Sequence, residues 1–350
     1  MGRAGLNRKT ALATATLTLA AEAPDLDVFS RFGGGAFGLN HHRGFTHSFL
    51  GVPLVAVAVV AFMYGIWRLR GRRIRSHLPP RWGLLFLYAC LAGLSHILLD
   101  YTTSYGIRPF WPFSEHWISW DIIFIVEPVL LVVLILGLTV PALFSLINQE
   151  IGARQKGPPG RVAATIALIA VFTYWGLCDF EHRHAVAALE ARTYQGADAI
   201  RVSAYPYPVN PFRWYGVAET PSFFATMNVD SMNVNSMTLN SLAPEVDPEG
   251  KMQIRYKPEE TPISLAAKRS YLGRVYLSWA QYPITETEQL ESDPAQDSRA
   301  AYVVRLRDLR YTYPGQSSSR GMLGARVFLT RDLKIVDEQM GVRSAPSGQR

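Results

Sequence analysis

Apolar residues are concentrated in four long segments in the first half of the chain. These segments cover residues 49–67, 82–99, 122–147 and 162–178. A helix needs about 20 mostly apolar residues to cross the hydrocarbon of a bilayer, and each segment meets or approaches that length. The pattern therefore predicts an α-helical multi-pass membrane domain with about four main spans.

The first 23 residues allow two interpretations. Basic residues precede the stretch ALATATLTLAAEA, which resembles a signal peptide that ends in a small-x-small cleavage site. Pro24 directly follows that site and is expected to block cleavage. We therefore predict a short uncleaved helix that carries Asp25 and Asp27 to the outer membrane face.

The distribution of charge predicts the topology. Lys and Arg outnumber Asp and Glu by 35 to 28, an excess that can indicate a nucleic-acid partner. Six arginines, however, lie together between the first two spans: Arg68, Arg70, Arg72, Arg73, Arg75 and Arg81. Cytoplasmic loops retain Lys and Arg, so this block indicates topology and no nucleic-acid partner is expected. The same rule places residues 100–121 on the outer side. The even number of spans then returns the region after residue 180 to that side, which is the periplasmic side of the inner membrane if the chain comes from a Gram-negative bacterium.

Ionisable residues from four parts of the chain fall near the predicted outer boundary. Such groups are costly at the edge of hydrocarbon unless they pair, meet water or bind a cation. The residues are Asp25, Asp27, His41, His42, His47, His96, Asp100, Asp121 and Glu127. Both cysteines lie inside apolar segments, which excludes a disulfide framework and a cysteine-rich zinc site. Any metal must therefore be held by histidines and carboxylates.

Spacing selects the candidate ligands. His96 and Asp100 are four residues apart and project from one helix face, although a His–Asp hydrogen bond that caps the helix is an alternative. Histidine is also concentrated in the segment 41–47. The predicted ligands are His42, His47, His96 and Asp100, together with Asp25 or Asp27. Neutral imidazole combined with carboxylate suits Zn²⁺, with Mn²⁺ or Fe²⁺ as alternatives.

Two other charged residues are candidates for a catalytic role. Arg43, if it faces the site, could pair with an anionic substrate group such as phosphate. Glu127 lies deeper and precedes Pro128. It could be a ligand, a protonated packing group, or a general acid or base tuned by burial.

Three motifs resemble those of the YdjM/YbcI-like membrane-bound metal-dependent hydrolases. They are HRG-x-THS at residues 42–48, PD-x-D at 24–27 and SH-x-x-x-D-x-x-x-SYG at 95–106. The resemblance covers residues 10–130 and extends loosely to P-x-NP-x-RW at 208–214. It implies a bacterial membrane protein with a divalent metal, and a more distant similarity to zinc-dependent phospholipase C and the S1/P1 nucleases implies phosphoester chemistry. Family members carry a further histidine near the start of their first helix, so this chain is expected to lack that ligand or to begin part-way along the helix.

The second half reads as a soluble domain rich in β-strands. Apolar and polar residues alternate over residues 200–205, 274–278 and 302–306, which predicts three of its strands. We therefore predict a membrane domain over 1–180, a soluble domain over 185–340 and a frayed tail over 341–350.

The predicted function is a membrane-bound hydrolase that acts on a phosphoester or lipid-linked substrate, with the lipid bilayer as its partner. The alternatives are a transporter that uses intramembrane His and Asp groups, and a non-catalytic anchor that presents the soluble domain to a partner.

Overall fold

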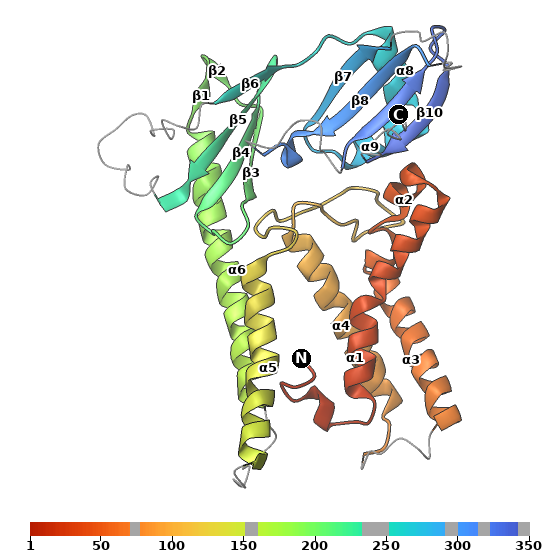
Figure 1. Cartoon of the computed structure of the whole chain (residues 1–350), viewed down its shortest axis with the longest axis vertical. Helices are drawn as coiled ribbons and strands as arrows, with labels where there is room; N and C mark the ends of the chain where they lie inside the picture. The colour runs from red at the N-terminus through yellow and green to blue at the C-terminus, as the bar shows by residue number, and fades with distance from the viewer. Residues whose placement is uncertain (71–77, 151–159, 233–251, 291–299, 314–322, 342–350) are drawn as a thin grey trace, which may run out of the picture. The chain divides into compact units, whose positions relative to one another are not determined.

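The computed structural model describes residues 1–70, 78–150, 160–232, 252–290, 300–313 and 323–341 (Figure 1). The chain forms two compact units. The first contains residues 1–27, 43–183 and 206–212, and the second contains residues 28–42, 184–205 and 213–350. The predicted tail falls almost wholly outside the described residues.

Among the residues that the structure describes, four helices that lie wholly or mainly in the first unit are long and apolar enough to cross a membrane, which confirms the predicted spans. They are α3 (Gly51–Arg70), α4 (Trp82–Thr102), α5 (Pro128–Glu150) and α6 (Arg161–Glu190). The most apolar of the four is α5.

A short helix, α1 (Ala13–Glu22), packs against α3 and α4 and follows the 3-10 turn η1 (Leu6–Arg8). Its contact face is built from small residues. Ala13 and Ala20 are buried in one cluster with Ala56 of α3 and Ala92 of α4. Small side chains allow helix backbones in a bilayer to approach closely. This packing fixes the end of α1, from which the chain continues into Asp25 and Asp27.

Two of the predicted spans have different limits in the structure. The third helix begins at Pro128, not at residue 122, because the amides of Ile122 and Ile123 donate to the carbonyl of Thr102 and hold that segment beside the end of α4. Proline is well suited to the first helical position because it lacks an N–H group. The fourth helix continues to Glu190, twelve residues beyond the apolar segment, and its last turns belong to the second unit.

The second unit contains two antiparallel four-stranded sheets, in agreement with the predicted β-rich domain. One has the order β3-β4-β5-β6 and the other β10-β9-β8-β7. Their strands are β3 (Arg201–Pro206), β4 (Arg213–Glu219), β5 (Phe223–Asp230), β6 (Gln253–Tyr256), β7 (Pro283–Gln289), β8 (Tyr302–Asp308), β9 (Ala325–Leu329) and β10 (Ile335–Met340), and a separate hairpin joins β1 (Thr193–Tyr194) to β2 (Ala197–Asp198). Trp214 pairs with Val229 in the first sheet and lies in its buried core.

One predicted strand is a helix. Residues 274–278 lie in α9 (Tyr271–Trp279), which follows α8 (Pro262–Arg269). The side chain of Ser270 accepts from the amide of Gly273 and caps the start of α9. Leu272, Val275 and Trp279 are buried at helical spacing. The short alternation was therefore misleading, because the N-cap and the wider three-to-four-residue period favour a helix.

The two units exchange segments, which the predicted domain limits did not include. Residues 28–42 leave the first unit after Asp27, form α2 (Gly35–His41) against α9 and β10 of the second unit, and return at Arg43. Conversely, residues 206–212 belong to the first unit.

Candidate metal centre

Three parts of the first unit supply the candidate ligands. Asp25 lies in the first turn of the 3-10 segment η2 (Pro24–Gly33), directly after α1. His47 ends a one-turn 3-10 helix, η3 (Phe45–His47). His96 and Asp100 lie one turn apart near the end of α4, and their spacing places both side chains on the same helix face.

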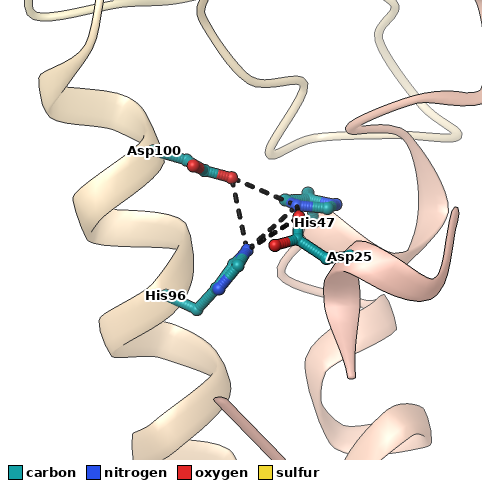
Figure 2. Close-up of side chains that lie close together, drawn as sticks. All are labelled: Asp25, His47, His96 and Asp100. Atoms are coloured by element: carbon teal, nitrogen blue, oxygen red, sulfur yellow. Dashed lines mark hydrogen bonds and ion pairs between the residues drawn. The ribbon is translucent and has the colours of Figure 1, made fainter. Parts of the chain in front are cut away.

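The ligand atoms of these four residues converge (Figure 2). One atom from each of Asp25, His47, His96 and Asp100 lies within 4.8 Å of the others. The two imidazole Nε2 atoms are 3.2 Å apart. Oδ2 of Asp100 lies 3.1 Å from Nε2 of His47 and 3.4 Å from that of His96. Oδ1 of Asp25 lies 3.6 and 3.4 Å from the same two nitrogens.

This arrangement fits a divalent cation. Four ligands bound tetrahedrally at about 2.0–2.2 Å lie about 3.3–3.6 Å from one another, close to the five distances above. Oδ2 of Asp100 is buried and accepts no hydrogen bond from the described residues, although two imidazole nitrogens lie near it. Two carboxylates and two neutral imidazoles together carry two negative charges, which balance a divalent ion. The predicted ligands His47, His96, Asp100 and Asp25 therefore do come together.

Asp27 contacts the far side of the His47 ring. Its Oδ2 lies 3.1 Å from Nδ1 of His47, whereas the converging atom of that ring is Nε2. The same oxygen accepts from the amide of Arg43 at 2.7 Å and from the hydroxyl of Thr46 at 3.3 Å. A carboxylate behind a metal-binding histidine fixes the orientation and tautomer of the ring. Asp27 thus occupies an orienting position, and it lies outside the group of four.

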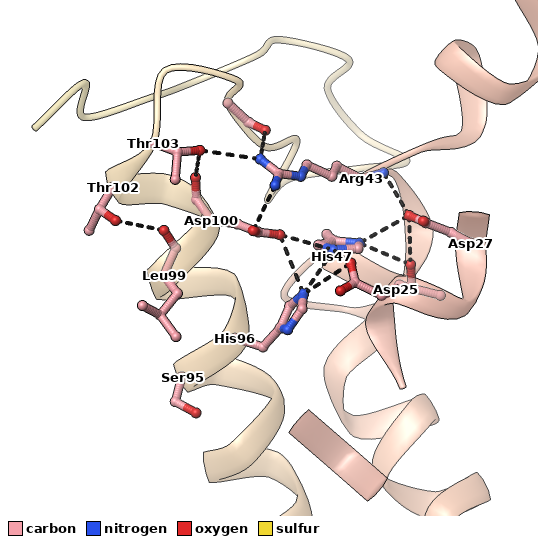
Figure 3. Close-up of polar contacts among 12 residues, drawn as sticks. Asp25, Asp27, Arg43, His47, Ser95, His96, Leu99, Asp100, Thr102 and Thr103 are labelled. Atoms are coloured by element: carbon pink, nitrogen blue, oxygen red, sulfur yellow. Dashed lines mark hydrogen bonds and ion pairs between the residues drawn. The ribbon is translucent and has the colours of Figure 1, made fainter. Parts of the chain in front are cut away.

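Arg43 holds the second oxygen of Asp100 (Figure 3). Its Nη2 donates to Oδ1 of Asp100 at 2.7 Å, and its Nη1 donates to the carbonyl of Gly106 at 3.2 Å. The guanidinium also lies 4.7 Å from the ring centroid of Tyr105. Asp100 is therefore oriented from behind by a cation, and its other oxygen is directed toward the two histidines.

The carboxylates change the ionisation of the group in the metal-free chain. Burial lowers the pKa of His47, but the surrounding Asp100, Asp25 and Asp27 outweigh it and raise this pKa to about 10. The contacts with His47 and His96 hold the pKa of Asp25 far below its usual range. Without a metal, an imidazolium at His47 therefore neutralises part of the negative charge.

The four side chains differ in exposure to solvent. The side chain of His47 is fully buried, and those of His96 and Asp100 are 15% and 14% exposed. The side chain of Asp25, by contrast, is 53% exposed. Asp25 is therefore the most accessible of the four candidate ligands.

Two predicted site residues lie elsewhere. His42 follows the last turn of α2, belongs to the second unit and is not a member of the group of four. Glu127 caps α5, accepting from the amide of Val129 at 3.2 Å and from the amide of Val209 at 3.1 Å. Its carboxylate therefore has a structural role at the start of α5. The catalytic role of Glu127 and the ligand role of His42 stay predictions that none of these contacts supports.

The contributions of Thr46, Tyr105 and the carbonyl of Gly106 to the site were not expected from the sequence. All three lie inside the quoted motifs, at 42–48 and 95–106, so the motifs themselves were the available signal. Thr46 donates to Asp27, whereas the contacts of Tyr105 and Gly106 with Arg43 depend on the loop after α4. That loop is held by a bridge between Ile107 and Ile118.

Comparison with known proteins agrees with this architecture. The chain is 30% identical over 108 residues to the uncharacterized protein YfhP of Bacillus subtilis (strain 168). The aligned region covers 31% of this chain and 30% of YfhP. The chain thus matches less than a third of that relative. No solved structure matches. Residues 1–185, which include all four ligands and most of the four long helices, match the family described as YdjM inner membrane protein. Because this match covers more than half of the 350 residues, the chain belongs to the YdjM inner membrane protein family.

Proposed function

We propose that this protein is a membrane-embedded, divalent-metal-dependent hydrolase, that Zn²⁺ is its ion and that it cleaves a phosphoester. The observation that carries the proposal is the convergence of two imidazole nitrogens and two carboxylate oxygens within 4.8 Å of one another. Buried ionisable groups within a membrane domain are costly and mark functional sites. Imidazole and carboxylate ligands together favour Zn²⁺, with Mn²⁺ and Fe²⁺ as the next choices.

The candidate ligands and the residues that orient them have separate roles in this proposal. A bound divalent ion lowers the pKa of water and polarises the bond to be cleaved. His47, His96 and Asp100 form the buried, fixed part of the site. Asp25 is the accessible member, so the substrate approaches from its side. Arg43 holds Asp100 in its orientation, and Asp27 does the same for His47. This matters for the rate, because a displacement of about 1 Å can cost two orders of magnitude.

The charge of the first unit supports an outer-face location for this site. Arg68 and Arg70 lie in the last turn of α3, and Arg81 directly precedes α4. His96 and Asp100 lie at the opposite end of α4. Because basic residues favour the cytoplasmic side, we propose that the metal centre, with the second unit, lies on the periplasmic side.

Elemental analysis and hydrolysis of bis(4-nitrophenyl) phosphate by the detergent-purified full chain test the proposal. We expect one equivalent of Zn²⁺ per chain and metal-dependent hydrolysis, both lost in His96→Ala. Asp179→Asn is a matched control, since Asp179 is a similarly enclosed carboxylate that accepts from Trp120 and pairs with Arg183 away from the site. Absence of metal from the wild type would refute the proposed site. Bound metal without hydrolysis of any phosphoester would instead indicate a purely structural ion.

A further inference from the structure

A surface of exposed apolar side chains lies next to the metal centre. We call it the aromatic edge and define it as Phe45, Phe49, Leu50, Phe110 and Phe113. Their exposed fractions range from 38% for Phe45 to 86% for Phe113. All five belong to the first unit.

The aromatic edge is a single surface built from two chain segments. The rings of Phe49 and Phe110 lie 5.7 Å apart, edge to face. The ring of Phe45 contacts that of Trp111 at the same distance. The amide of Phe49 donates to the carbonyl of Pro109 at 2.9 Å and ties the segments together.

The metal ligand His47 belongs to the same short segment. Phe45 and Phe49 each lie two residues from His47, and two residues span at most about 7 Å of chain. The His47 side chain is buried, whereas its two phenylalanine neighbours are exposed. The aromatic edge therefore begins within about two residue lengths of His47, one of the groups that would hold the metal.

Hydrocarbon is the medium that this surface fits. Residues 44–55 and 109–113 contain no Asp, Glu, Lys or Arg. Exposed phenylalanine side chains are more stable in hydrocarbon than in water, and contiguous apolar surfaces of this kind mark binding to proteins or membranes.

Continuity with α3 identifies the membrane as the occupant. Leu54 and Val57 of α3 are 52% and 55% exposed, and Leu50, which directly precedes α3, is 45% exposed. These residues form a row, four and three positions apart, with the spacing of one helix face. Exposed apolar side chains on a helix of membrane-crossing length fit a lipid environment. The aromatic edge extends the same row past the end of the span, toward the headgroup layer.

We propose that the aromatic edge lies among the lipids of the outer leaflet and that the substrate is a membrane phospholipid, taken from the bilayer with its phosphoester at the metal centre. This inference rests on the proposed function and specifies its substrate class. In the reaction, the oxygen of one water forms a bond to phosphorus, the bond to the leaving alcohol oxygen breaks, and that oxygen takes a proton from the water. The acyl chains stay in the bilayer along the aromatic edge.

The substrate claim is tested with the double variant Phe110→Ser/Phe113→Ser, in the full chain reconstituted in vesicles of phosphatidylethanolamine and phosphatidylglycerol. Phe144→Ser is the control, because Phe144 is 60% exposed but lies near the far end of α5. We expect hydrolysis of the vesicle lipid to fall about tenfold in the double variant, with hydrolysis of the soluble bis(4-nitrophenyl) phosphate and the metal content both within about twofold of wild type. An equal loss on both substrates, or no loss on the vesicle lipid, would overturn the claim.

A second measurement does not depend on hydrolysis. A fluorophore attached to Phe113→Cys, in a Cys90→Ala background where Cys178 is only 2% exposed, reports the surroundings of the aromatic edge. We expect quenching by brominated lipids and protection from iodide. Quenching by iodide without quenching by brominated lipids would show that the aromatic edge lies in water, even if hydrolysis occurs. If the wild type cleaves neither substrate, the proposed function fails and the substrate claim fails with it, while the fluorophore still decides whether the surface meets lipid.

Discussion

The substitution Asp27→Asn separates an orienting role for Asp27 from a ligand role. Asp27 contacts Nδ1 of His47 at 3.1 Å, and the metal-facing atom of that ring is Nε2. Asparagine keeps the size of the side chain and one acceptor oxygen but removes the negative charge behind the imidazole. Loss of such a supporting group typically weakens metal binding about 10- to 100-fold. That factor corresponds to about 1.4–2.8 kcal/mol, since each tenfold change is about 1.4 kcal/mol.

The measurement is a Zn²⁺ titration against a competing chelator, together with elemental analysis at saturating metal. We expect Asp27→Asn to bind one equivalent with the weaker affinity given above, whereas Asp100→Asn loses the site. Asp179→Asn should behave as wild type. If Asp27→Asn abolishes binding as completely as Asp100→Asn does, Asp27 is itself a ligand. An affinity within twofold of wild type would show that its contact with His47 has no effect on the metal.

Three other predictions follow from the site and its surroundings. Arg43→Gln leaves the partly buried Asp100 without its cation, 2.7 Å away, and should destabilise the metal-free chain by about 3 kcal/mol in thermal unfolding; an unchanged melting temperature would contradict this. The pKa of His47 rises from 6.5 to about 10 on folding, so its protonation stabilises the metal-free fold fully below pH 6.5 and this contribution is lost as the pH rises toward 10. Because the metal must displace that proton, apparent Zn²⁺ affinity should increase with pH over the same interval, and a pH-independent affinity would show that His47 is neutral in the metal-free chain. Glu127→Ala removes the acceptor for the amide of Val209 and should cost about 1–3 kcal/mol of stability without loss of metal; loss of hydrolysis with fold and metal intact would instead assign Glu127 a catalytic role.

The helices and most ligands could be predicted because their signals are local. The spans follow from runs of apolar residues, and the pairing of His96 with Asp100 follows from one turn of α4. The meeting of His47 with this pair could be expected only as a match in depth within the bilayer. Depth fixes one coordinate, so it could not separate His47 from His42, which lies five residues earlier and belongs to the second unit.

The roles of Asp27 and Arg43 depend on tertiary contacts that have no sequence period. Asp27 stood out as a charge near the predicted boundary, and Arg43 as a possible partner of an anionic substrate group. The role of Arg43 depends on the loop after α4, whose Gly106 carbonyl and Tyr105 ring contact its guanidinium. That cation is therefore directed at a ligand of the site, whereas the sequence suggested that it pairs with the substrate. The start of α5 was misplaced for a similar reason, because the amide of Ile122 bonds to a distant carbonyl of α4.

Residues 28–42 make the site near the start of the chain depend on contacts with elements near its end. These residues connect Asp27 to Arg43 and fold against α9 and β10, where Cβ of Met340 would lie 2.4 Å from a Cβ added to Gly35. A protein cut after α6 would retain all four candidate ligands, yet it would lack α9 and β10. The face of α2 that packs against them would then be exposed to solvent. Isolating the helical half for biochemistry would therefore loosen the connection between Asp27 and Arg43, which orient the candidate ligands. A different second half acquired in evolution would have to provide a surface on which α2 can pack.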